Sequence, residues 1–429
     1  MATIRKVYKF GGASVKDAQA VQNLRDIVAE HKGEDIFLVV SAMGKTTNML
    51  ESVLREFREH DGKLPISALN GVMEYHENII LDLFDHNTEH PIFDSISQLF
   101  LELYDKLQLT NQDYDYQYDQ TVSYGELIST TIIQEYLNQC EIPTRWLDAR
   151  KYVITDSCYR SAVPDWTETR KRIKKLQEEH IRGLVCITQG FIGGTANGKS
   201  ATTLGREGSD YTAAIFANCL DAEEVTIWKD VDGLRNADPK RFPDTVKLPH
   251  LSYSEAIELA FYGASIIHPK TIKPLQNKDI VLKVQSFLNP NLSPSIIDGQ
   301  ADQNEMEIPS YIVKEGQTLV SFSPRDYSFM NEKNLQLIFA TCAEIGLHAN
   351  MIQTSALMLS ICFDHNQTTL SSLIEALSSA FSIKYNKDLI LFSIRHYSTP
   401  TATEETFLHD KHVLIKQSSR TTLQYVLNV

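Results

Sequence analysis

The amino-terminal end of the chain alternates between strand-forming and helix-forming segments. A strand is predicted at IRKVYKF (residues 4–10), followed by a glycine turn, GGAS (11–14), and a segment with apolar residues at helical spacing (15–31). The next segment, DIFLVVSA (35–42), is a continuous apolar run, which is typical of a parallel strand buried on both faces. Strands that alternate with helices in this way predict an α/β fold, an αβα sandwich around an open, mainly parallel sheet.

The same alternation continues further along the chain. Strands are predicted in four more segments: PTRWLDA (143–149), GLVCITQGF (183–191), EVTIWKDV (224–231) and DIVLKVQSF (279–287). A helix is predicted at residues 209–220 and another at residues 252–263. In the second helix Ser252 and Glu255 have the spacing of a capping box, and Gly263 marks the exit.

A polar, proline-bearing segment at residues 289–309 indicates a domain boundary. We therefore expect a first domain over residues 1–295, with a helical insertion at about residues 67–109, and a second domain over residues 310–429. The second domain shows the order β-α-β-β-α-β, which is the split ferredoxin-like α+β unit. Its final segment holds only one further strand pair, so a second unit is truncated.

Charge and composition exclude several classes of protein. The 429 residues carry a formal charge of −14, which argues against nucleic acid or a membrane surface as the main partner. No apolar run approaches the length of a membrane span, and the first residues lack the apolar core of a signal peptide, so we expect a cytoplasmic protein. Six cysteines are scattered without a CxxC pair and are predicted to be buried free thiols.

One short segment, GGTANGKS (193–200), fits the pattern of a phosphate-binding P-loop. A P-loop binds phosphate when a strand precedes it and a helix begins at its Lys-Ser pair. The strand is present, but ATTLGREGSD (201–210) has threonines and glycines where the helix should begin. We therefore predict a polar hairpin tip in which Lys199 is an ordinary exposed lysine.

Two other glycine turns follow predicted strands. KFGGAS (9–14) places Lys9 at a strand end and two glycines before a helix, so that backbone amides can approach a phosphate beside a lysine charge. VSAMGKTTN (40–48) is a second strand exit with glycine and hydroxyl residues. Either turn alone is also explained as a simple turn. Together they lie at the carboxyl ends of neighbouring strands, where open α/β sheets bind ligands.

Charged residues near two predicted helices allow two interpretations. Asp210 either complements a helix dipole with Arg206 as its surface partner, or Arg206 binds a carboxylate and Asp210 an ammonium group, as recognition of an amino acid requires. Glu126 has capping-box spacing from Ser123, which explains it without a ligand. WKDVDGLRNADPK (228–240) is either an Asp-rich turn or an edge that faces a nucleotide.

Seven segments in order resemble the successive signatures of the aspartokinase family, which has the amino-acid kinase fold. They are KFGGAS, VSAMGKTTN, SYGELIS, ITQGFIG, TTLGREGSDYTAA, WKDVDGLRNADPK and SYSEAIELAFYGASIIHPKT. The resemblance covers about residues 5–290, and the C-terminal part resembles the family's ACT regulatory region. In this family the segment before TTLGR is a variable loop and not the phosphate cradle.

The resemblance implies ATP-dependent phosphorylation of the β-carboxylate of L-aspartate, the first step of lysine, threonine and methionine biosynthesis. It implies that Lys9 and the amides of Gly11 and Gly12 stabilise the transferring phosphoryl group. Arg206 would bind the α-carboxylate of aspartate, and Glu126 and Asp210 its ammonium group. The remaining residues of the implied aspartate pocket are Ser41, Thr47 and Phe191.

The resemblance also implies which residues bind the nucleotide. They are Lys9, Lys229, Asp230, Arg235, Lys240 and Ser265. Magnesium would be held mainly by the phosphates of ATP, with no metal bound by protein side chains alone. The expected partners are ATP and aspartate, a second copy of the chain bound through the ACT region, and an amino-acid effector. Nucleic acid and membranes are not expected.

Three departures from the family pattern leave alternatives open. Glu207 adds a negative charge where glycine is usual, Lys229 replaces a common threonine, and Ser265 replaces a common phosphate-contacting lysine. The alternatives are a kinase of the same fold for another carboxylate, such as glutamate or acetylglutamate, and a lapsed kinase that senses amino acids. Because the implied site binds both an amine and a carboxylate, it disfavours an N-acetylated substrate.

Overall fold

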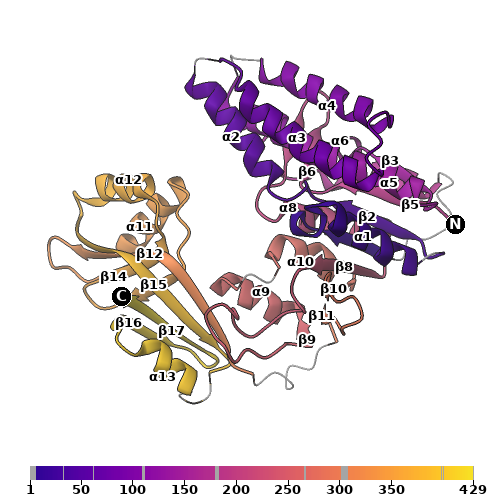
Figure 1. Ribbon diagram of the computed structural model, residues 1–429. Coiled ribbons are helices and arrows are strands. Elements are labelled where there is room, and N and C mark those ends of the chain that lie inside the picture. The colour runs from indigo at the N-terminus through magenta and orange to yellow at the C-terminus, as the bar shows by residue number, and fades with distance from the viewer. Residues whose placement is uncertain are drawn as a thin grey trace. The chain divides into compact units, whose positions relative to one another are not determined.

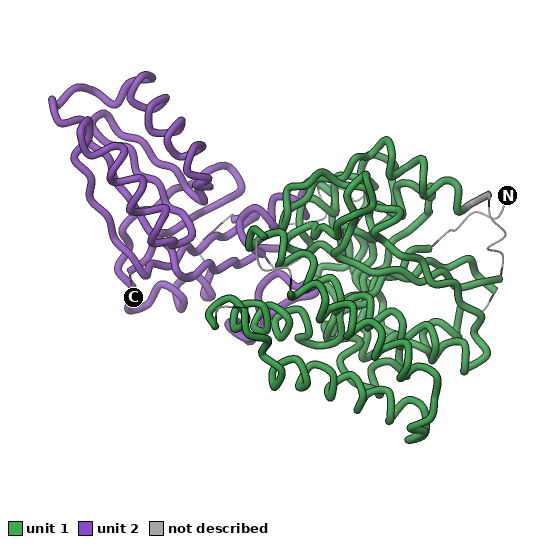
Figure 2. The backbone as a smooth tube through the Cα atoms, turned by 90° about the horizontal axis from the view of Figure 1, so that it is seen from above, with its two compact units in different colours: residues 1–234, 248–253, 267–301 green, residues 235–247, 254–266, 302–429 purple. Residues whose placement is uncertain are grey.

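A computed structural model of the chain (Figure 1) describes most of its length. The described residues are 6–31, 33–60, 62–108, 112–178, 183–264, 267–300, 308–397, 399 and 401–428. The chain forms two compact units, which are coloured separately in Figure 2. The first unit holds residues 1–234, 248–253 and 267–301, and the second holds residues 235–247, 254–266 and 302–429.

The first unit is built on an eight-stranded sheet of order β3-β5-β2-β1-β8-β10-β11-β9. Neighbouring strands from β3 to β10 are parallel, β11 is antiparallel to β10, and β9 is parallel to β11. Its strands are β1 (Lys6–Phe10), β2 (Ile36–Val40), β3 (Thr144–Leu147), β5 (Val185–Gln189), β8 (Glu224–Lys229), β9 (His250–Ser252), β10 (Val281–Ser286) and β11 (Ser295–Asp298). The predicted α/β class with a mainly parallel sheet is confirmed.

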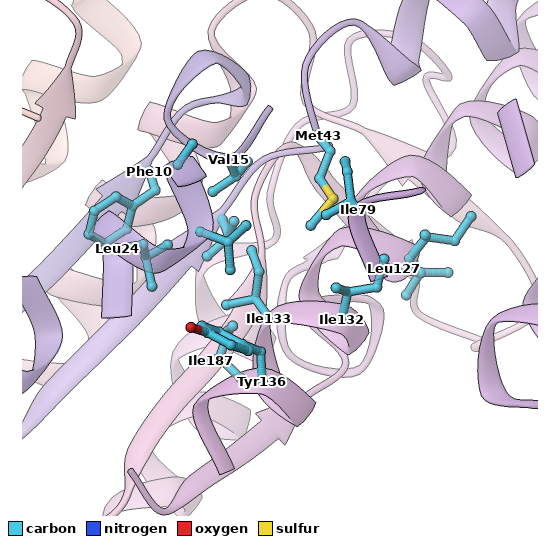
Figure 3. Close-up of a cluster of buried hydrophobic side chains, with 14 of the residues drawn as sticks. Phe10, Val15, Leu24, Met43, Ile79, Leu127, Ile132, Ile133, Tyr136 and Ile187 are labelled. Atoms are coloured by element: carbon cyan, nitrogen blue, oxygen red, sulfur yellow. The ribbon is translucent and has the colours of Figure 1, made fainter. Parts of the chain in front are cut away.

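Helices pack on both faces of this sheet, because successive side chains of a buried strand point to opposite sides. On one face Phe37 of β2 stacks on Phe216 of α8, with ring centroids 4.5 Å apart. On the other face Leu38 joins a large apolar cluster with side chains of α1 and α5, part of which is shown in Figure 3. The helices of this unit are α1 (Ala18–Glu30), α2 (Thr46–Glu59), α3 (Ile66–Leu83), α4 (Ile92–Leu107), α5 (Tyr114–Gln139), α6 (Ala149–Tyr152), α7 (Trp166–Glu178), α8 (Gly208–Leu220), α10 (Pro269–Gln276) and the 3₁₀-helix η1 (Gly12–Val15).

Helices α2 to α5 form the helical layer seen in Figure 1, and the segment expected to be a helical insertion forms α3 and α4. Each of these two helices buries one apolar stripe, which includes Ile80 on α3 and Leu103 on α4. Helix α5 differs because it is buried around almost its whole circumference from Gln117 to Ile133. Several polar side chains of α5 are therefore buried, among them Asp119, Gln120 and Glu126.

A second, three-stranded sheet contains the segment that matches a P-loop pattern. Its strands are β4 (Ile154–Thr155), β6 (Ile192–Thr195) and β7 (Ala201–Thr203). Strands β6 and β7 are antiparallel, so GGTANGKS forms a β-hairpin with no helix at its Lys-Ser pair. Lys199 is exposed at the tip. The prediction of a hairpin tip is confirmed.

The second unit contains a six-stranded antiparallel sheet of order β13-β14-β12-β15-β17-β16. The order β12-α11-β13-β14-α12-β15 confirms the predicted β-α-β-β-α-β pattern, and α13, β16 and β17 follow it. The elements are α9 (Tyr253–Tyr262), β12 (Ser310–Pro324), α11 (Glu332–Glu344), β13 (Met351–Thr354), β14 (Leu359–Asp364), α12 (Gln367–Leu377), β15 (Phe381–Arg395), α13 (Ala402–Leu408), β16 (His412–Ser418) and β17 (Thr422–Asn428). Val320, Phe322 and Ile361 belong to the core between this sheet and helices α11 and α12.

Two further sequence expectations concern the cysteines and the membrane. All six cysteines are free thiols, as expected, and four of them are buried. Cys158 is exposed and Cys140 is partly exposed, so the expectation of burial is wrong for these two. Cys158 is exposed because it lies in a turn outside the core, where its amide binds the Asp156 side chain. Within the described ranges no helix combines the length and the apolarity that a membrane span requires.

Candidate active site

The carboxyl ends of β1 and β2 lie side by side, because the parallel register pairs Lys9 with Val39 and Phe10 with Val40. A cavity of about 550 Å³ opens beside these strand ends, and all of its lining residues belong to the first unit. The sequence-predicted residues that line it are Lys9, Gly12, Ser41, Thr47, Glu126, Phe191, Arg206, Asp210 and Lys229. Lys9 and Arg206, which are far apart in the sequence, therefore open onto the same space.

Lys9 is held by an acid from another segment. It lies near the end of β1 with its side chain on the α8 side of the sheet, and its Nζ is 2.6 Å from Oδ1 of Asp210 in the first turn of α8. Both side chains are almost fully buried. Asp210 therefore pairs with Lys9, so the interpretation of Asp210 as a surface partner of Arg206 is wrong. Removing one member of such a buried pair leaves an uncompensated charge.

The glycine turn after β1 packs against the turn after β2. The Gly44 amide donates a 3.0 Å hydrogen bond to the Gly12 carbonyl. A Cβ atom on Gly12 would lie 2.7 Å from the Gly44 carbonyl oxygen, so any side chain there would force the two turns apart. Gly11 precedes η1 with extended backbone angles and lies beside the Lys9 ammonium. The two turns form a compact backbone surface next to a positive charge, which suits an anion.

Glu126 lies inside helix α5 and not at its start, so the capping-box interpretation is wrong. The Ser123–Glu126 spacing wrongly predicted a helix start here, because α5 begins about three turns earlier, at Tyr114. The Glu126 carboxyl is buried and accepts one long hydrogen bond, 3.4 Å from the Ala42 amide to Oε1. Its Oε2 has no hydrogen-bond partner among the described residues. Burial raises the pKa of Glu126 to about 8, so a cation that enters the cavity would favour its ionised form.

The opposite wall comes from the segments before and at the start of α8. The hydroxyls of Ser41 and Ser209 are 2.9 Å apart, so the turn after β2 contacts the first turn of α8. Phe191 has a left-handed φ of 67° and packs so closely on Gly208 that a Cβ atom there would lie 2.6 Å from the ring. The Phe191 amide donates to Thr212 Oγ1 at 3.0 Å. These contacts hold the start of α8 against the cavity.

Arg206 is exposed at the cavity, and its neighbour Glu207 has a specific partner. Glu207 Oε2 accepts a 2.8 Å hydrogen bond from the His268 amide, at the start of α10. Glu207 also has a φ of 53°, a conformation in which glycine is favoured. The acidic side chain at this position thus joins α8 to α10 through a backbone amide.

The predicted nucleotide residues are distributed unevenly. Lys229 ends β8 and lines the cavity, and Asp230 follows it in the chain. Arg235 and Lys240 belong to the second unit, where the Arg235 guanidinium donates to the Thr245 carbonyl at 2.9 Å. Ser265 lies outside the described residues. A nucleotide role for these residues stays a prediction.

Several cavity residues were not predicted as site residues from the sequence, among them Gly44, Tyr118, Arg160 and Ser209. Gly44 and Ser209 lie inside segments that had been singled out, so the glycine turn and the helix start were usable signals. Tyr118 and Arg160 come from segments with no recognisable pattern. The described part of the chain contains no group of three or more His, Cys, Asp or Glu side chains that could bind a metal ion.

Comparisons with known proteins agree with this geometry. A model of the amino acid kinase family matches residues 5–286. Aspartokinase 1 (chloroplastic) of Arabidopsis thaliana is 28% identical over 376 residues, which are 86% of this chain and 65% of that protein. The bifunctional aspartokinase/homoserine dehydrogenase 1 of the same plant is 28% identical over 87% of this chain, which spans only 42% of that relative's length.

Solved structures resemble the chain over nearly its full length. E. coli aspartokinase III in complex with aspartate and ADP has a TM-score of 0.84 and 26% sequence identity, and the match covers 99% of this chain and 96% of that one. The same enzyme in complex with lysine and aspartate has a TM-score of 0.78 at the same identity and coverage.

The buried carboxyl of Glu126 predicts how stability depends on pH. Because its folded pKa, about 8, is raised above the ordinary glutamate value of 4.5, the folded state binds more protons between these values and loses stability as pH rises through them. Glu126→Gln removes this loss, so it should leave stability little changed at pH 4.5 and increase it progressively as pH rises towards 8, by at most roughly 1 kcal/mol for each pH unit. Urea denaturation at several pH values measures the difference, and a pH-independent difference would contradict the assignment.

Proposed function

The chain belongs to the amino acid kinase family, and we propose that it transfers the γ-phosphoryl group of ATP to the β-carboxylate of L-aspartate, forming 4-phospho-L-aspartate. The curated relatives are aspartokinases or contain one, and E. coli aspartokinase III has been solved with aspartate and ADP. In this proposal the chain carries out the first step of lysine, threonine and methionine biosynthesis. It does so in the cytoplasm, as the sequence predicts.

The observation that carries the proposal is the convergence of opposite charges on one cavity. Lys9 and Arg206 supply positive charge, and Glu126 and Asp210 supply acidic groups, from three separate segments of the first unit. An amino acid with a second carboxylate needs such a mixture, because its ammonium and carboxylate groups must each find a partner. Thr47 and Ser41 add hydroxyl groups to the same walls.

For the acceptor, we propose that Arg206 binds the α-carboxylate and that Glu126 and Asp210 meet the α-ammonium. A β-carboxylate has an unperturbed pKa of about 3.9, so it is already ionised at pH 7 and needs no general base. The site has to align this nucleophile with the γ-phosphate and neutralise charge on the transferring oxygens. Phe191 forms part of one wall of the pocket, where it packs against Gly208.

At the phosphoryl end, we propose that Lys9 and the amides of Gly11 and Gly12 stabilise the transferring group. The ion pair with Asp210 fixes the Lys9 ammonium before substrate enters, so little reorganisation is needed during transfer. ATP would extend along Lys229 and Asp230, with Arg235, Lys240 and Ser265 as further candidate contacts. Magnesium, held mainly by the ATP phosphates, would supply additional charge neutralisation.

The division of labour along the chain is part of the same proposal. Residues 1–295 would catalyse the reaction, and residues 310–429 would act as an ACT regulatory region with one full and one truncated unit. An amino acid is the expected effector. A homodimer through this region is also proposed, because β13 and β16 are the two edges of the six-stranded sheet.

Trapping of the product separates this proposal from its two alternatives. Purified protein with ATP, Mg²⁺ and hydroxylamine should form a hydroxamate with L-aspartate and far less with glutamate or N-acetylglutamate. A product with another acid alone would favour a different kinase of the same fold. Binding of an amino acid with no hydroxamate from any acid would favour a lapsed kinase that acts as a sensor.

Lys9→Ala should lower kcat by roughly 10²–10³-fold, because it removes one preorganised charge from the transferring phosphoryl group. Lys199→Ala should leave kcat unchanged, since this lysine is exposed at a hairpin tip. Hydroxamate formation at saturating aspartate and ATP gives kcat for both variants, and melting curves check their folding. The opposite ranking of the two variants would support the P-loop interpretation.

A further inference from the structure

Arg160 has an unusual backbone conformation beside the cavity. Its φ is 66°, in the left-handed backbone region that residues other than glycine, asparagine and aspartate rarely adopt. Such conformations persist only where the surrounding structure enforces them, and they concentrate at functional sites. Arg160 also lines the candidate active site, together with Tyr118, Thr47 and Glu126.

A buried carboxylate enforces this conformation. Both oxygens of Asp119 lie 3.1 Å from the Arg160 amide, and the same carboxylate accepts from the Thr203 amide at 2.8 Å and from the Thr203 hydroxyl at 2.7 Å. The Ala162 amide donates to the Thr203 carbonyl at 2.9 Å. The loop that carries Arg160 is therefore fastened to β7, and β7 leads within three residues to Arg206. One strand end positions two arginines at one cavity.

The guanidinium of Arg160 is held in place but keeps hydrogen-bonding capacity. Its Cζ lies 4.3 Å from the centre of the Tyr118 ring, an orienting cation–π contact that uses no N–H donor. Its ion pairs are long: Nη2 lies 3.6 Å from Oε1 of Glu51, and Nη1 lies 3.5 Å from Oδ1 of Asp115. Both acidic side chains are partly exposed. Loose ion pairs at the surface contribute little energy, so a better carboxylate can replace them.

The position of Arg160 along two helices shows which end of the cavity it serves. Glu51 lies one turn beyond Thr47 on α2, about 6 Å further from the Gly44 turn, and Tyr118 lies about 12 Å along α5 from Glu126. Arg160 contacts Glu51 and Tyr118, so it sits at the end of the cavity remote from Gly12 and Gly44. The glycine turns are the proposed phosphoryl end. In the proposed function the β-carboxylate of the acceptor faces the glycine turns, so its non-reacting carboxylate is directed towards the remote end.

We propose that Arg160 binds the α-carboxylate of the amino-acid acceptor together with Arg206. This inference rests on the proposed function, because it concerns the acceptor of that reaction. Two guanidinium groups around one carboxylate favour an acceptor with a free carboxylate at the far end and disfavour its neutral amide. Asp119 is the positioning residue for Arg160, since it binds the Arg160 backbone amide and does not itself line the cavity.

The test uses two substitutions of Arg160 in the full chain. Arg160→Gly removes the side chain at a φ that glycine adopts without strain, so the melting temperature should change little. The KM for aspartate should rise roughly 10- to 100-fold, as expected for loss of a charge-assisted hydrogen bond, with kcat and the KM for ATP nearly unchanged. Arg160→Lys keeps the charge without the planar fork and should show a smaller rise.

Arg58 provides a matched control. Its guanidinium lies over the Tyr114 ring, 5.5 Å from the ring centre, and binds Gln117 at 2.8 Å, but it does not line the cavity. Arg58→Gln should therefore leave the KM for aspartate unchanged. A double variant of Arg160 and Arg206 should raise this KM by less than the product of the single effects, because both arginines bind the same carboxylate.

Each outcome decides one question. The role of Arg160 is overturned if Arg160→Gly leaves the KM for aspartate unchanged, or if this variant loses kcat and thermal stability together. In either case an active wild-type protein leaves the proposed function intact. If the wild-type protein forms no hydroxamate, the proposed function fails and calorimetry with L-aspartate becomes the test. Binding to the wild type that weakens in Arg160→Gly but not in Arg58→Gln still supports a carboxylate-binding Arg160. If the wild-type protein does not bind L-aspartate, the carboxylate-binding role of Arg160 is overturned as well.

Discussion

The position of β1 between β2 and β8 is the constraint on which the candidate site depends. All three strands are parallel and buried, and the register places Lys9 beside Val39 on one side and Ile227 on the other. Because these strands end at the same level, the residues that follow them reach one edge of the sheet. The glycine turn after β1, the turn after β2 and Lys229 at the end of β8 therefore face one cavity, although some 220 residues separate the first from the last.

Helix α5 carries two buried carboxyl groups with different roles, although burial of either group in its charged form is unfavourable. Asp119 is satisfied by its bonds to Thr203 and to the Arg160 amide, and burial still raises its pKa to about 6. Glu126, two turns further on, accepts a long hydrogen bond from the Ala42 amide at 3.4 Å, and burial raises its pKa to about 8. The first group secures the scaffold. The Glu126 carboxyl has hydrogen-bonding capacity that the described protein groups do not use, as expected of a side chain that binds a cationic group of a ligand.

Much of the fold could be predicted from the sequence, because continuous apolar runs and glycine turns report burial and chain reversal locally. The segments predicted to be strands contain β1, β2, β3, β5, β8 and β10, and β2 falls on a continuous apolar run. The site was harder, because spacing along the chain favoured a helix start for Glu126 and gave no sign that Asp210 pairs with Lys9. The role suggested for Arg160 had no local signal, since its conformation depends on Asp119, which lies 41 residues earlier.

The hairpin of β6 and β7 explains why a phosphate-binding pattern can occur without a phosphate site. A Cβ atom on Gly194 would lie 2.3 Å from the Arg150 carbonyl oxygen, and one on Gly193 would lie 2.7 Å from that of Val153, so close backbone packing requires both glycines. The tip from Ala196 to Lys199 is exposed, and a Cβ atom on Gly198 would meet no other atom within 4 Å, although its φ of 69° favours glycine at that position. This tip is consequently a suitable insertion point for an affinity epitope or a fluorescent label, which would leave the sheet beneath it undisturbed.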